Sequence, residues 1–294
     1  MHIFKTKSAV HGFSENAHSA GKTVGFVATM GALHEGHLTL VRYALMQNDI
    51  VIVSIFVNPT QFGHDEDYSQ YPRTLEEDCV LLEELGVHGV FAPTAGEMYD
   101  STIEQMNAND GGLTRTQINP GELATLWEGE LRPAHFAGVC LVVGKLLNIV
   151  RPNRAYFGEK DYQQLAIIRQ LAADLDLFVE VIGVSIERAD DGLALSSRNR
   201  YLNVEQRKGA CSLYESIVLA QSLCAKGEVM CAEIVRDVTN YLTLRCDGML
   251  SIGYVAIVDP MTLKPLESVI DEGRLLISVQ LDGIHLIDNA LICA

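Results

Sequence analysis

The stretch that decides the fold reads Thr29-Met30-Gly31-Ala32-Leu33-His34-Glu35-Gly36-His37. An apolar run at residues 24–28 precedes it and predicts a buried parallel strand, while residues 38–45 have the apolar spacing of a helix. The stretch is therefore expected to be a strand-to-helix turn, the place where open α/β sheets hold their ligands. Gly31 permits a sharp turn, and Gly36 lets a ligand approach the backbone between two histidines.

These histidines, His34 and His37, lie three residues apart and would share one face of the helix's first turn. Unsatisfied N–H groups at a helix start attract phosphate, and both imidazoles can donate to the same phosphate oxygens. A glycine-rich helix start with two surface histidines is the alternative, but the flanking strand and helix favour a nucleotide site. The pattern is not a P-loop, because no Gly-Lys-Ser/Thr follows, and it is not Gly-x-Gly-x-x-Gly.

Bulk composition narrows the class of protein. The length of 294 residues predicts about two domains, and a hydrophobic content of 48% suffices for a large core. The net charge of −16 opposes a nucleic-acid partner, because non-specific binding to phosphate backbones needs a basic surface. No apolar stretch approaches the roughly 20 residues of a membrane span, and the N-terminus lacks the apolar core of a signal peptide. The seven cysteines lack Cys-x-x-Cys spacing, which indicates a reducing cytoplasm without a zinc site or disulfide framework.

The chain is predicted to divide into residues 1–187, a Rossmann-like doubly wound parallel α/β sheet, and residues 188–294, a smaller α+β lid. The first part is expected to hold a short strand and a helix within 1–22, strands at 24–28, 49–57, 89–92, 154–157 and 178–186, helices at 75–85, 122–128 and 135–150, and a short strand near 114–118. The second part is expected to hold helices at 203–225 and 231–244 and strands at 252–258, 274–281 and 284–287. Thr74 and Glu77 predict a capping box, and Trp127 is expected to pack in a core.

Two polar residues, Asn58 and Gln61, follow the strand at 49–57. Pro59 stops the ladder there, so both side chains should project beyond the carboxyl end of the sheet, into the same crevice as His34. An ordinary polar loop residue is an equally good interpretation of Gln61 alone.

A second strand-to-helix turn comes at Gly158-Glu159-Lys160-Asp161, before a helix that should run to about Leu175. A lysine at a helix start is unusual, because the helix dipole disfavours a cation there. A phosphate that Lys160 neutralises would explain it, and a surface lysine paired with Asp161 is the alternative.

The segment Ser196-Ser197-Arg198 follows the last predicted strand of the first part. Two hydroxyls beside an arginine suit phosphate oxygens, which a guanidinium can bind in bidentate fashion. An ordinary polar linker at a domain boundary is the alternative.

These motifs carry a resemblance to a known family. His-x-Gly-His resembles the signature of the nucleotidyltransferase superfamily, and the Ser-Ser-Arg segment is placed like its Lys-Met-Ser-Lys-Ser loop. Almost the whole chain resembles the pantoate–β-alanine ligases, through Thr29–His37, Phe56-Val57-Asn58-Pro59-Thr60-Gln61-Phe62, Tyr71-Pro72-Arg73-Thr74, Phe157-Gly158-Glu159-Lys160-Asp161-Tyr162-Gln163-Gln164, Gly192-Leu193-Ala194-Leu195-Ser196-Ser197-Arg198-Asn199 and Leu286-Ile287-Asp288-Asn289. The chain departs at Ala28, where the family usually has Pro, at Ala134, usually Gly or Thr, and at His285, usually Arg.

The resemblance implies ATP-dependent condensation of pantoate with β-alanine through a pantoyl adenylate. It implies catalytic roles for His37, the proton donor, and for His34 and Lys160, and it implies substrate binding by Gln61 and Gln164. It implies ATP contacts at Met30, Gly31, Ala32, Leu33, His34, Glu35, Gly36, His37, Gly158, Glu159, Lys160, Asp161, Leu195, Ser196, Ser197 and Arg198. Arg132 and His135, at the start of the helix at 135–150, are further candidate anion contacts.

Mg²⁺ is expected with ATP, held mostly by phosphates and water, with no dedicated protein ligand and with Asp78 as an outer-sphere partner. The resemblance also implies a homodimer that acts on small molecules. The composition predicts a cytoplasmic protein without nucleic-acid or membrane partners. Two alternatives stay open at this point. One is a small adenylyltransferase whose product keeps the nucleotide, and the other is a nucleotide-sensing protein without turnover.

Overall fold

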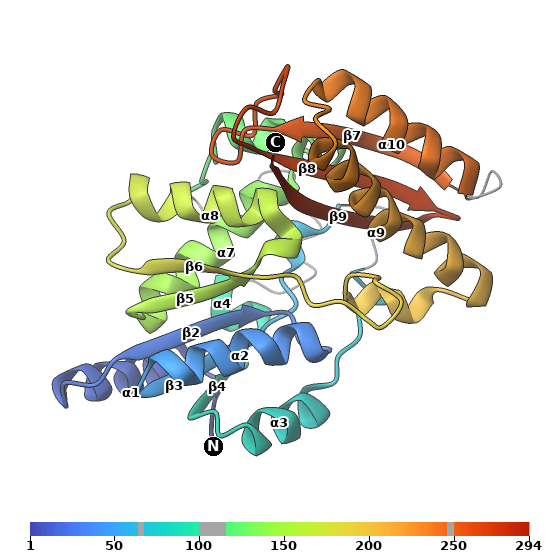
Figure 1. The fold of residues 1–294 in the computed structure, drawn as a ribbon. Coiled ribbons are helices and arrows are strands. Elements are labelled where there is room, and N and C mark those ends of the chain that lie inside the picture. Colours follow the sequence, from blue (N-terminus) through green and yellow to red (C-terminus); the bar gives the residue numbers. More distant parts are fainter. Residues whose placement is uncertain (64–67, 100–115, 246–249, 294) are drawn as a thin grey trace. The chain divides into compact units, whose positions relative to one another are not determined.

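A computed structural model describes residues 1–63, 68–99, 116–245 and 250–293 of the chain (Figure 1). The chain forms two compact units. The first unit comprises Met1–Thr125, Arg132–Glu159 and Gln164–Ser185, and the second comprises Leu126–Leu131, Lys160–Gln163 and Ile186–Ala294. The second unit thus contains two short segments from earlier in the sequence as well as the C-terminal third of the chain.

The first unit is built on a six-stranded sheet with the strand order β1-β4-β3-β2-β5-β6, in which every neighbouring pair is parallel. Its strands are β1 His2–Phe4, β2 Val24–Thr29, β3 Ile50–Ile55, β4 Gly89–Phe91, β5 Arg154–Gly158 and β6 Glu180–Val184. The order reverses between β2 and β5, which are adjacent although more than a hundred residues separate them in sequence. This is the topological switch point, beside which α/β sheets bind ligands at the carboxyl ends of the strands.

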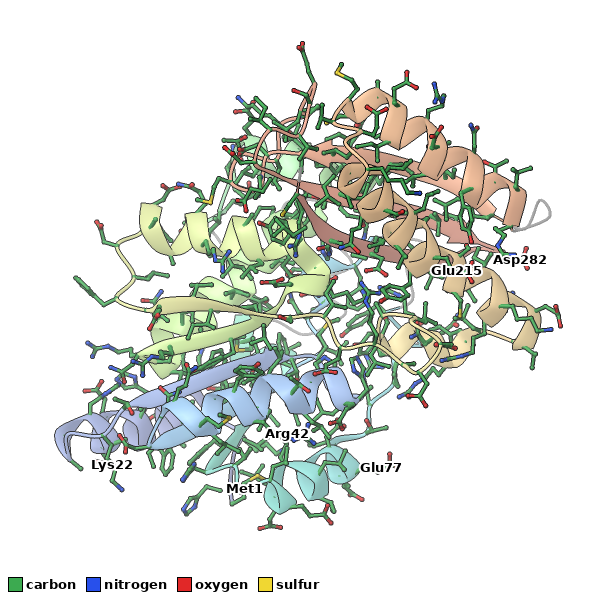
Figure 2. All side chains as sticks on the ribbon, viewed as in Figure 1. Met1, Lys22, Arg42, Glu77, Glu215 and Asp282 are labelled. Carbon is green, nitrogen blue, oxygen red and sulfur yellow. The ribbon has the colours of Figure 1, made fainter. Side chains whose placement is uncertain are left out.

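Helices cover both faces of this sheet, as a doubly wound fold requires (Figure 1). Alternate residues of a strand point to opposite faces, so Phe26 of β2 packs on one face and Val27 on the other. One face is covered by α1 Lys7–Ser19, α4 Ala95–Tyr99, α7 His135–Val150 and α8 Tyr162–Asp174. The other is covered by α2 Glu35–Gln47 and α3 Leu75–Glu84. Charged side chains such as Lys22 and Arg42 are exposed (Figure 2).

The second unit contains a three-stranded antiparallel sheet in the order β7-β8-β9, formed by Leu250–Val258, Glu272–Leu281 and Ile284–Cys293. Two helices, α9 Val204–Ala225 and α10 Cys231–Arg245, pack on it through a shared apolar core (Figure 1). The Asn203 side chain accepts from the Gln206 N–H and the Gln206 side chain accepts from the Asn203 N–H, which is the cap expected at the start of α9. The predicted fold class, a Rossmann-like sheet with a smaller α+β part, is confirmed.

Some predicted elements were wrong in extent or kind. The capping box at Thr74 does not form, because the Thr74 hydroxyl donates to the Asp78 carboxylate instead (3.2 Å). The helix expected at 122–128 is two short pieces, η2 Glu122–Thr125 and α6 Glu128–Leu131, separated at Trp127, whose positive φ of 46° interrupts a right-handed helix. Of the strand expected near 114–118, residues 114 and 115 lie outside the described residues, and residues 116–118 form no strand.

The helix predicted at 135–150 is observed as α7, and its apolar side chains pack on the sheet and on α1 and α8 of the same unit. Among the residues that the structure describes, no helix has both the length and the apolar character needed to cross a membrane.

Candidate functional site

The turn after β2 is sharp and is held from α3. Gly31 and Ala32 both have positive φ, 83° and 52°, a conformation that costs an alanine roughly 1–2 kcal/mol. The buried carboxylate of Asp78 compensates by accepting the backbone N–H groups of Ala32 (3.0 Å) and Leu33 (2.8 Å). These two amides are therefore engaged within the protein, so any phosphate at this turn must be bound by other groups.

The histidine pair is close, but not in the predicted manner. His34 is the N-cap of α2 and has extended backbone, so it precedes the first helical turn instead of lying on it. The two imidazole centroids are nevertheless only 4.1 Å apart. The His34 N–H donates to Nδ1 of His37 (3.4 Å), and this contact favours the neutral tautomer of His37 in which Nε2 carries the proton. His37 is thus arranged to donate a hydrogen bond from Nε2.

The residues after β3 lie beside this turn. They form a short 3₁₀ helix, η1 Pro59–Gln61, capped by the side chain of Asn58. The Gln61 amide nitrogen is 3.2 Å from the Met30 sulfur, so Gln61 lies next to the β2–α2 turn as expected. Asn58 is fully buried, and its Nδ2 donates to the Gln61 side-chain oxygen (3.1 Å).

Two residues near the start of α7 fix the main chain of the same segment. His135 Nδ1 lies 2.9 Å from the Gln61 carbonyl oxygen, and an Arg132 guanidinium nitrogen donates to that oxygen at 3.3 Å. A Cβ atom on Gly138 would lie 2.2 Å from the Thr60 carbonyl oxygen, so η1 packs directly on α7. The candidate anion contacts Arg132 and His135 are therefore also structural supports of Gln61.

The carboxyl end of β5 brings a further predicted motif to the switch point. Gly158 ends β5, the neighbour of β2, and Glu159 follows it. Gln164 is half-buried on the first turn of α8. Together with the β2–α2 turn and Gln61, these groups lie at one edge of the sheet, the edge at which a doubly wound fold holds its ligand.

Lys160 belongs to the second unit and lies in a 3₁₀ turn, η3 Glu159–Asp161, which leads directly into α8 at Tyr162. Its ammonium is 3.8 Å from the Asp161 carboxylate, and its side chain is only 20% exposed, so it is paired but is not a surface lysine. The Asn289 side chain donates to the Lys160 carbonyl oxygen (2.8 Å) and accepts from Arg274 (2.8 Å). The C-terminal strand β9 therefore holds the segment that carries Lys160.

The serine–arginine segment also belongs to the second unit. Ser196 caps a 3₁₀ helix, η4 Ser197–Tyr201, by accepting the Arg198 N–H (3.3 Å), and Leu195 precedes it; all four residues from 195 to 198 are half-buried. The preceding loop is held by Arg188, which pairs in bidentate fashion with the buried Asp288 of β9 (2.6 and 2.9 Å). An arginine–carboxylate pair of this kind gives the loop a defined geometry.

A buried acid in the second unit was not found from the sequence. Glu128 accepts from the Tyr254 hydroxyl (3.1 Å) and lies 3.2 Å from Nε2 of His285, which also contacts the Ser278 hydroxyl (3.1 Å). Burial alone would raise the pKa of Glu128, but hydrogen bonds from His285, Ser278 and Tyr254 outweigh it and hold that pKa below its ordinary value. His285, one of the departures from the family pattern, is thus a partner of this carboxylate.

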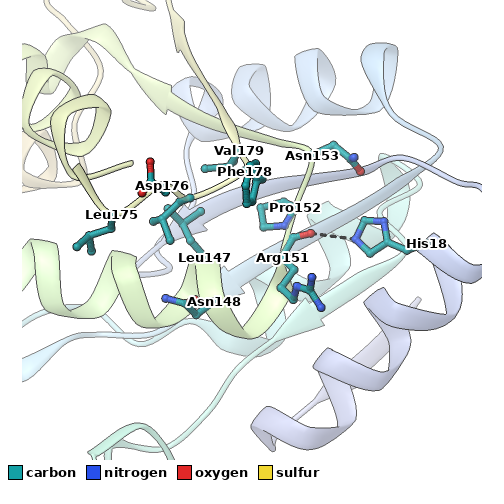
Figure 3. A pocket seen from close by; sticks show the side chains of 11 residues that line it. His18, Leu147, Asn148, Arg151, Pro152, Asn153, Leu175, Asp176, Phe178 and Val179 are labelled. Carbon is teal, nitrogen blue, oxygen red and sulfur yellow. Dashed lines mark hydrogen bonds between the residues drawn. The ribbon is translucent and has the colours of Figure 1, made fainter. Parts of the chain in front are cut away.

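The described residues contain no cluster of three or more histidine, cysteine or acidic side chains able to hold a metal ion. A pocket of about 480 Å³ lies elsewhere in the first unit (Figure 3). Its lining comes from the end of α7 and from the segments that precede β5 and β6, including Leu147, Pro152 and Phe178. The His18 imidazole closes one side by contacting the Arg151 carbonyl oxygen (2.9 Å). The pocket is therefore at the amino ends of the strands, the edge opposite to the histidine pair.

The sheet order and the polar groups beside its switch point define a Rossmann-like α/β protein of the class that binds ligands at this edge. The model of the pantoate-beta-alanine ligase family matches residues 2–291, and the chain belongs to this family. It is therefore an enzyme, and the predicted ligation of pantoate to β-alanine is confirmed in preference to the two alternatives.

Similar proteins match over their full length. A pantothenate synthetase of Aquifex aeolicus is 47% identical, with 98% of this chain and 97% of the relative covered, and one of Fervidobacterium nodosum is 46% identical, with 99% of each covered. The crystal structure of pantothenate synthetase from Thermus thermophilus has a TM-score of 0.87 at 42% identity, with 99% of each chain covered. That of pantoate-beta-alanine ligase from Francisella tularensis, complexed with Beta-gamma ATP and β-alanine, has a TM-score of 0.78 at 33% identity and covers 99% of this chain and 97% of its own.

Proposed function

We propose that the chain joins pantoate to β-alanine in two steps driven by ATP. In the first step, a pantoate carboxylate oxygen attacks the α-phosphorus of ATP, the bond to the bridging oxygen breaks, and pantoyl adenylate and pyrophosphate result. In the second step, the β-alanine nitrogen attacks the pantoyl carbonyl carbon, AMP leaves with the bonding electron pair, and the nitrogen loses a proton to give the amide. The observation that carries this proposal is the histidine pair beside the switch point, in a chain of this family.

The chemistry needs positive or donating groups, because carboxylate attack on a triphosphate brings negative charges together. Donors placed where charge builds up on the phosphate oxygens lower the barrier. His37 is the proposed proton donor on the strength of its match to the family motif; its Nδ1 accepts a backbone N–H, so Nε2 carries the hydrogen that it can share with charge developing on a phosphate oxygen. His34 and Lys160 are the further catalytic donors, His34 beside His37 and Lys160 on a turn that is anchored by β9.

ATP contacts are proposed along three segments of the chain. They comprise Met30, Gly31, Ala32, Leu33, His34, Glu35, Gly36 and His37 after β2, Gly158, Glu159, Lys160 and Asp161 after β5, and Leu195, Ser196, Ser197 and Arg198 before and within η4. Because Asp78 occupies the amides of Ala32 and Leu33, these two residues would contact the nucleotide by packing and not by donation. Gln61 and Gln164 are the proposed ligands of pantoate, and Gln61 also faces β-alanine.

Mg²⁺ is proposed to accompany ATP, where it would neutralise charge on the phosphates. Both carboxylate oxygens of Asp78 already accept backbone amides, so Asp78 is not arranged as a direct ligand. This fits an ion held by phosphates and water, which is how Mg²⁺ is often bound beside nucleotides.

Residues 188–294 are proposed to act as a lid, because Ser196 to Arg198 must approach the nucleotide for the proposed contacts to form. Small-angle scattering should show a more compact enzyme with ATP and pantoate than without, and identical profiles would count against the lid. The enzyme is proposed to be a cytoplasmic homodimer without nucleic-acid or membrane partners. The support for the dimer is the family resemblance, because the apolar face of α7 is covered within its own unit.

One assay tests the proposed function. Labelled pyrophosphate should exchange into ATP only when pantoate is present, and AMP should appear when β-alanine is added. Exchange without pantoate, or a product that keeps the nucleotide, would indicate a different adenylyltransferase. Nucleotide binding without exchange would indicate a sensor.

A further inference from the structure

We propose that Tyr99 is a positioning residue which, through Asn58, fixes the side-chain amide of Gln61 so that its NH₂ group, and not its oxygen, faces the substrate. The inference rests on the proposed function, in which Gln61 binds pantoate. It goes further by assigning the polarity of that contact and by naming a residue that no motif contains.

The side-chain amide of Asn58 has a fixed orientation. The buried Tyr99 hydroxyl, at the end of α4, donates to the Asn58 side-chain oxygen at 2.6 Å. The same oxygen accepts the Thr60 hydroxyl (2.9 Å) and the Thr60 N–H (3.3 Å). A hydroxyl can donate or accept, but the Thr60 N–H can only donate and the Gly138 carbonyl oxygen, 3.3 Å from Nδ2, can only accept. These two backbone groups fix which end of Asn58 is the oxygen, and the Tyr99 hydroxyl holds that oxygen in place by donating to it.

The orientation of Asn58 determines that of the Gln61 side-chain amide. With its oxygen fixed, Asn58 must direct Nδ2 the other way, where it donates to the Gly138 carbonyl oxygen (3.3 Å) and to the Gln61 side-chain oxygen (3.1 Å). Gln61 would present donor to donor if its amide were reversed. The oxygen of Gln61 therefore faces Asn58, and the NH₂ group points towards the Met30 sulfur (3.2 Å).

The Gln61 N–H groups favour an oxygen atom of the substrate as their partner. A thioether is a weak acceptor, so a carboxylate or hydroxyl oxygen would compete well for the Gln61 N–H groups. His135 and Arg132 already fix the main chain of Gln61. The orientation of its side-chain amide therefore depends on the hydrogen bonds that run from Tyr99 through Asn58 to Gln61, which we call the relay. Every polar group of pantoate is an oxygen, whereas β-alanine also carries an amino group. The arrangement thus selects a substrate oxygen at this position.

Tyr99→Phe tests the relay, with Tyr156→Phe as the matched control. Tyr156 is also fully buried in the first unit, and its hydroxyl also contacts an asparagine side chain, that of Asn48 (2.8 Å), but neither residue belongs to the proposed site. In steady-state assays, Tyr99→Phe should raise the KM for pantoate about tenfold with kcat within twofold, which is the size expected for loss of one hydrogen bond. Tyr156→Phe should leave both constants unchanged.

Gln61→Glu provides a second test that does not depend on Tyr99. A carboxylate cannot donate, so this variant should lose pantoate binding by calorimetry, whereas unchanged or tighter binding would show that Gln61 offers its oxygen and would overturn the proposal. Equal KM values for Tyr99→Phe and Tyr156→Phe would also overturn it. If the wild-type enzyme showed no pantoate-dependent pyrophosphate exchange, the proposed function would fail and not the relay alone.

Discussion

Replacing Asp78 by alanine should destabilise the turn that carries the histidine pair. The carboxylate of Asp78 is 2% exposed and accepts three hydrogen bonds, from the N–H groups of Ala32 and Leu33 and from the Thr74 hydroxyl. The hydroxyl can rotate to another partner, but the two backbone groups cannot. The substitution therefore leaves two buried N–H groups without an acceptor.

The expected loss in the free energy of unfolding follows from these two unsatisfied N–H groups. Each buried donor left unsatisfied costs about 1–3 kcal/mol, so two cost about 2–6 kcal/mol. Native domains are stable by only about 5–15 kcal/mol in total, so the loss should be a large share of the stability. Adding Ala32→Gly to the variant should recover about 1 kcal/mol, because glycine adopts the positive φ at this position without the steric cost of alanine.

Urea unfolding followed by circular dichroism measures these differences. Glu77→Ala is the matched control, because Glu77 is the adjacent carboxylate on α3 and is exposed (Figure 2). Its effect should stay within about 0.5 kcal/mol. If Asp78→Ala were no more destabilising than Glu77→Ala, the buried Asp78 carboxylate would not be what stabilises the turn.

Three further variants address the chemistry and the second unit. His37→Ala should lower turnover by roughly 10²–10³ with an unchanged circular dichroism spectrum, the usual size for one lost transition-state donor, and a loss below about threefold would remove it from the mechanism. Lys160→Ala should impair pyrophosphate exchange more than calorimetric binding of pantoate, and equal losses would reduce Lys160 to a positioning role. The pKa of Glu128 lies below its ordinary value in the folded protein, so its carboxylate stabilises the fold above its unfolded pKa of about 4.5, and this contribution is lost as pH falls through the lower, folded value. Glu128→Gln should therefore flatten the fall in unfolding free energy below about pH 4.5, and identical pH profiles for variant and wild type would contradict this assignment.

The sequence predicted the central strands β2, β3 and β4 well because they are buried on both faces and form continuous apolar runs. It did not predict how long the other strands are. The alternation from 178 suggested a long strand, but β6 begins at Glu180 because its neighbour β5 begins at the paired Arg154. In the same way, β9 continues to Cys293 and not only to residue 287, because β8 supplies partners back to Glu272. Strand length depends on the partner strand, which a single sequence window does not contain.

The candidate site was predictable where its residues follow a strand or cap a helix, as His34, His37 and Gln61 do. It was not predictable where distant residues meet. Tyr99 lies 41 residues from Asn58, and Glu128 lies 126 residues from Tyr254, so no local pattern could pair them. The local pattern also misled at Thr74, whose hydroxyl forms a tertiary contact with Asp78 in place of a helix cap.

Residues 30–37 and residues 195–198 are both proposed to contact the nucleotide. Hydrogen exchange measured by mass spectrometry, with and without a non-hydrolysable ATP analogue and pantoate, tests this proposal. Exchange should become slower on binding in both segments. Protection confined to the segment after β2, with the serine–arginine segment unchanged, would contradict the proposal.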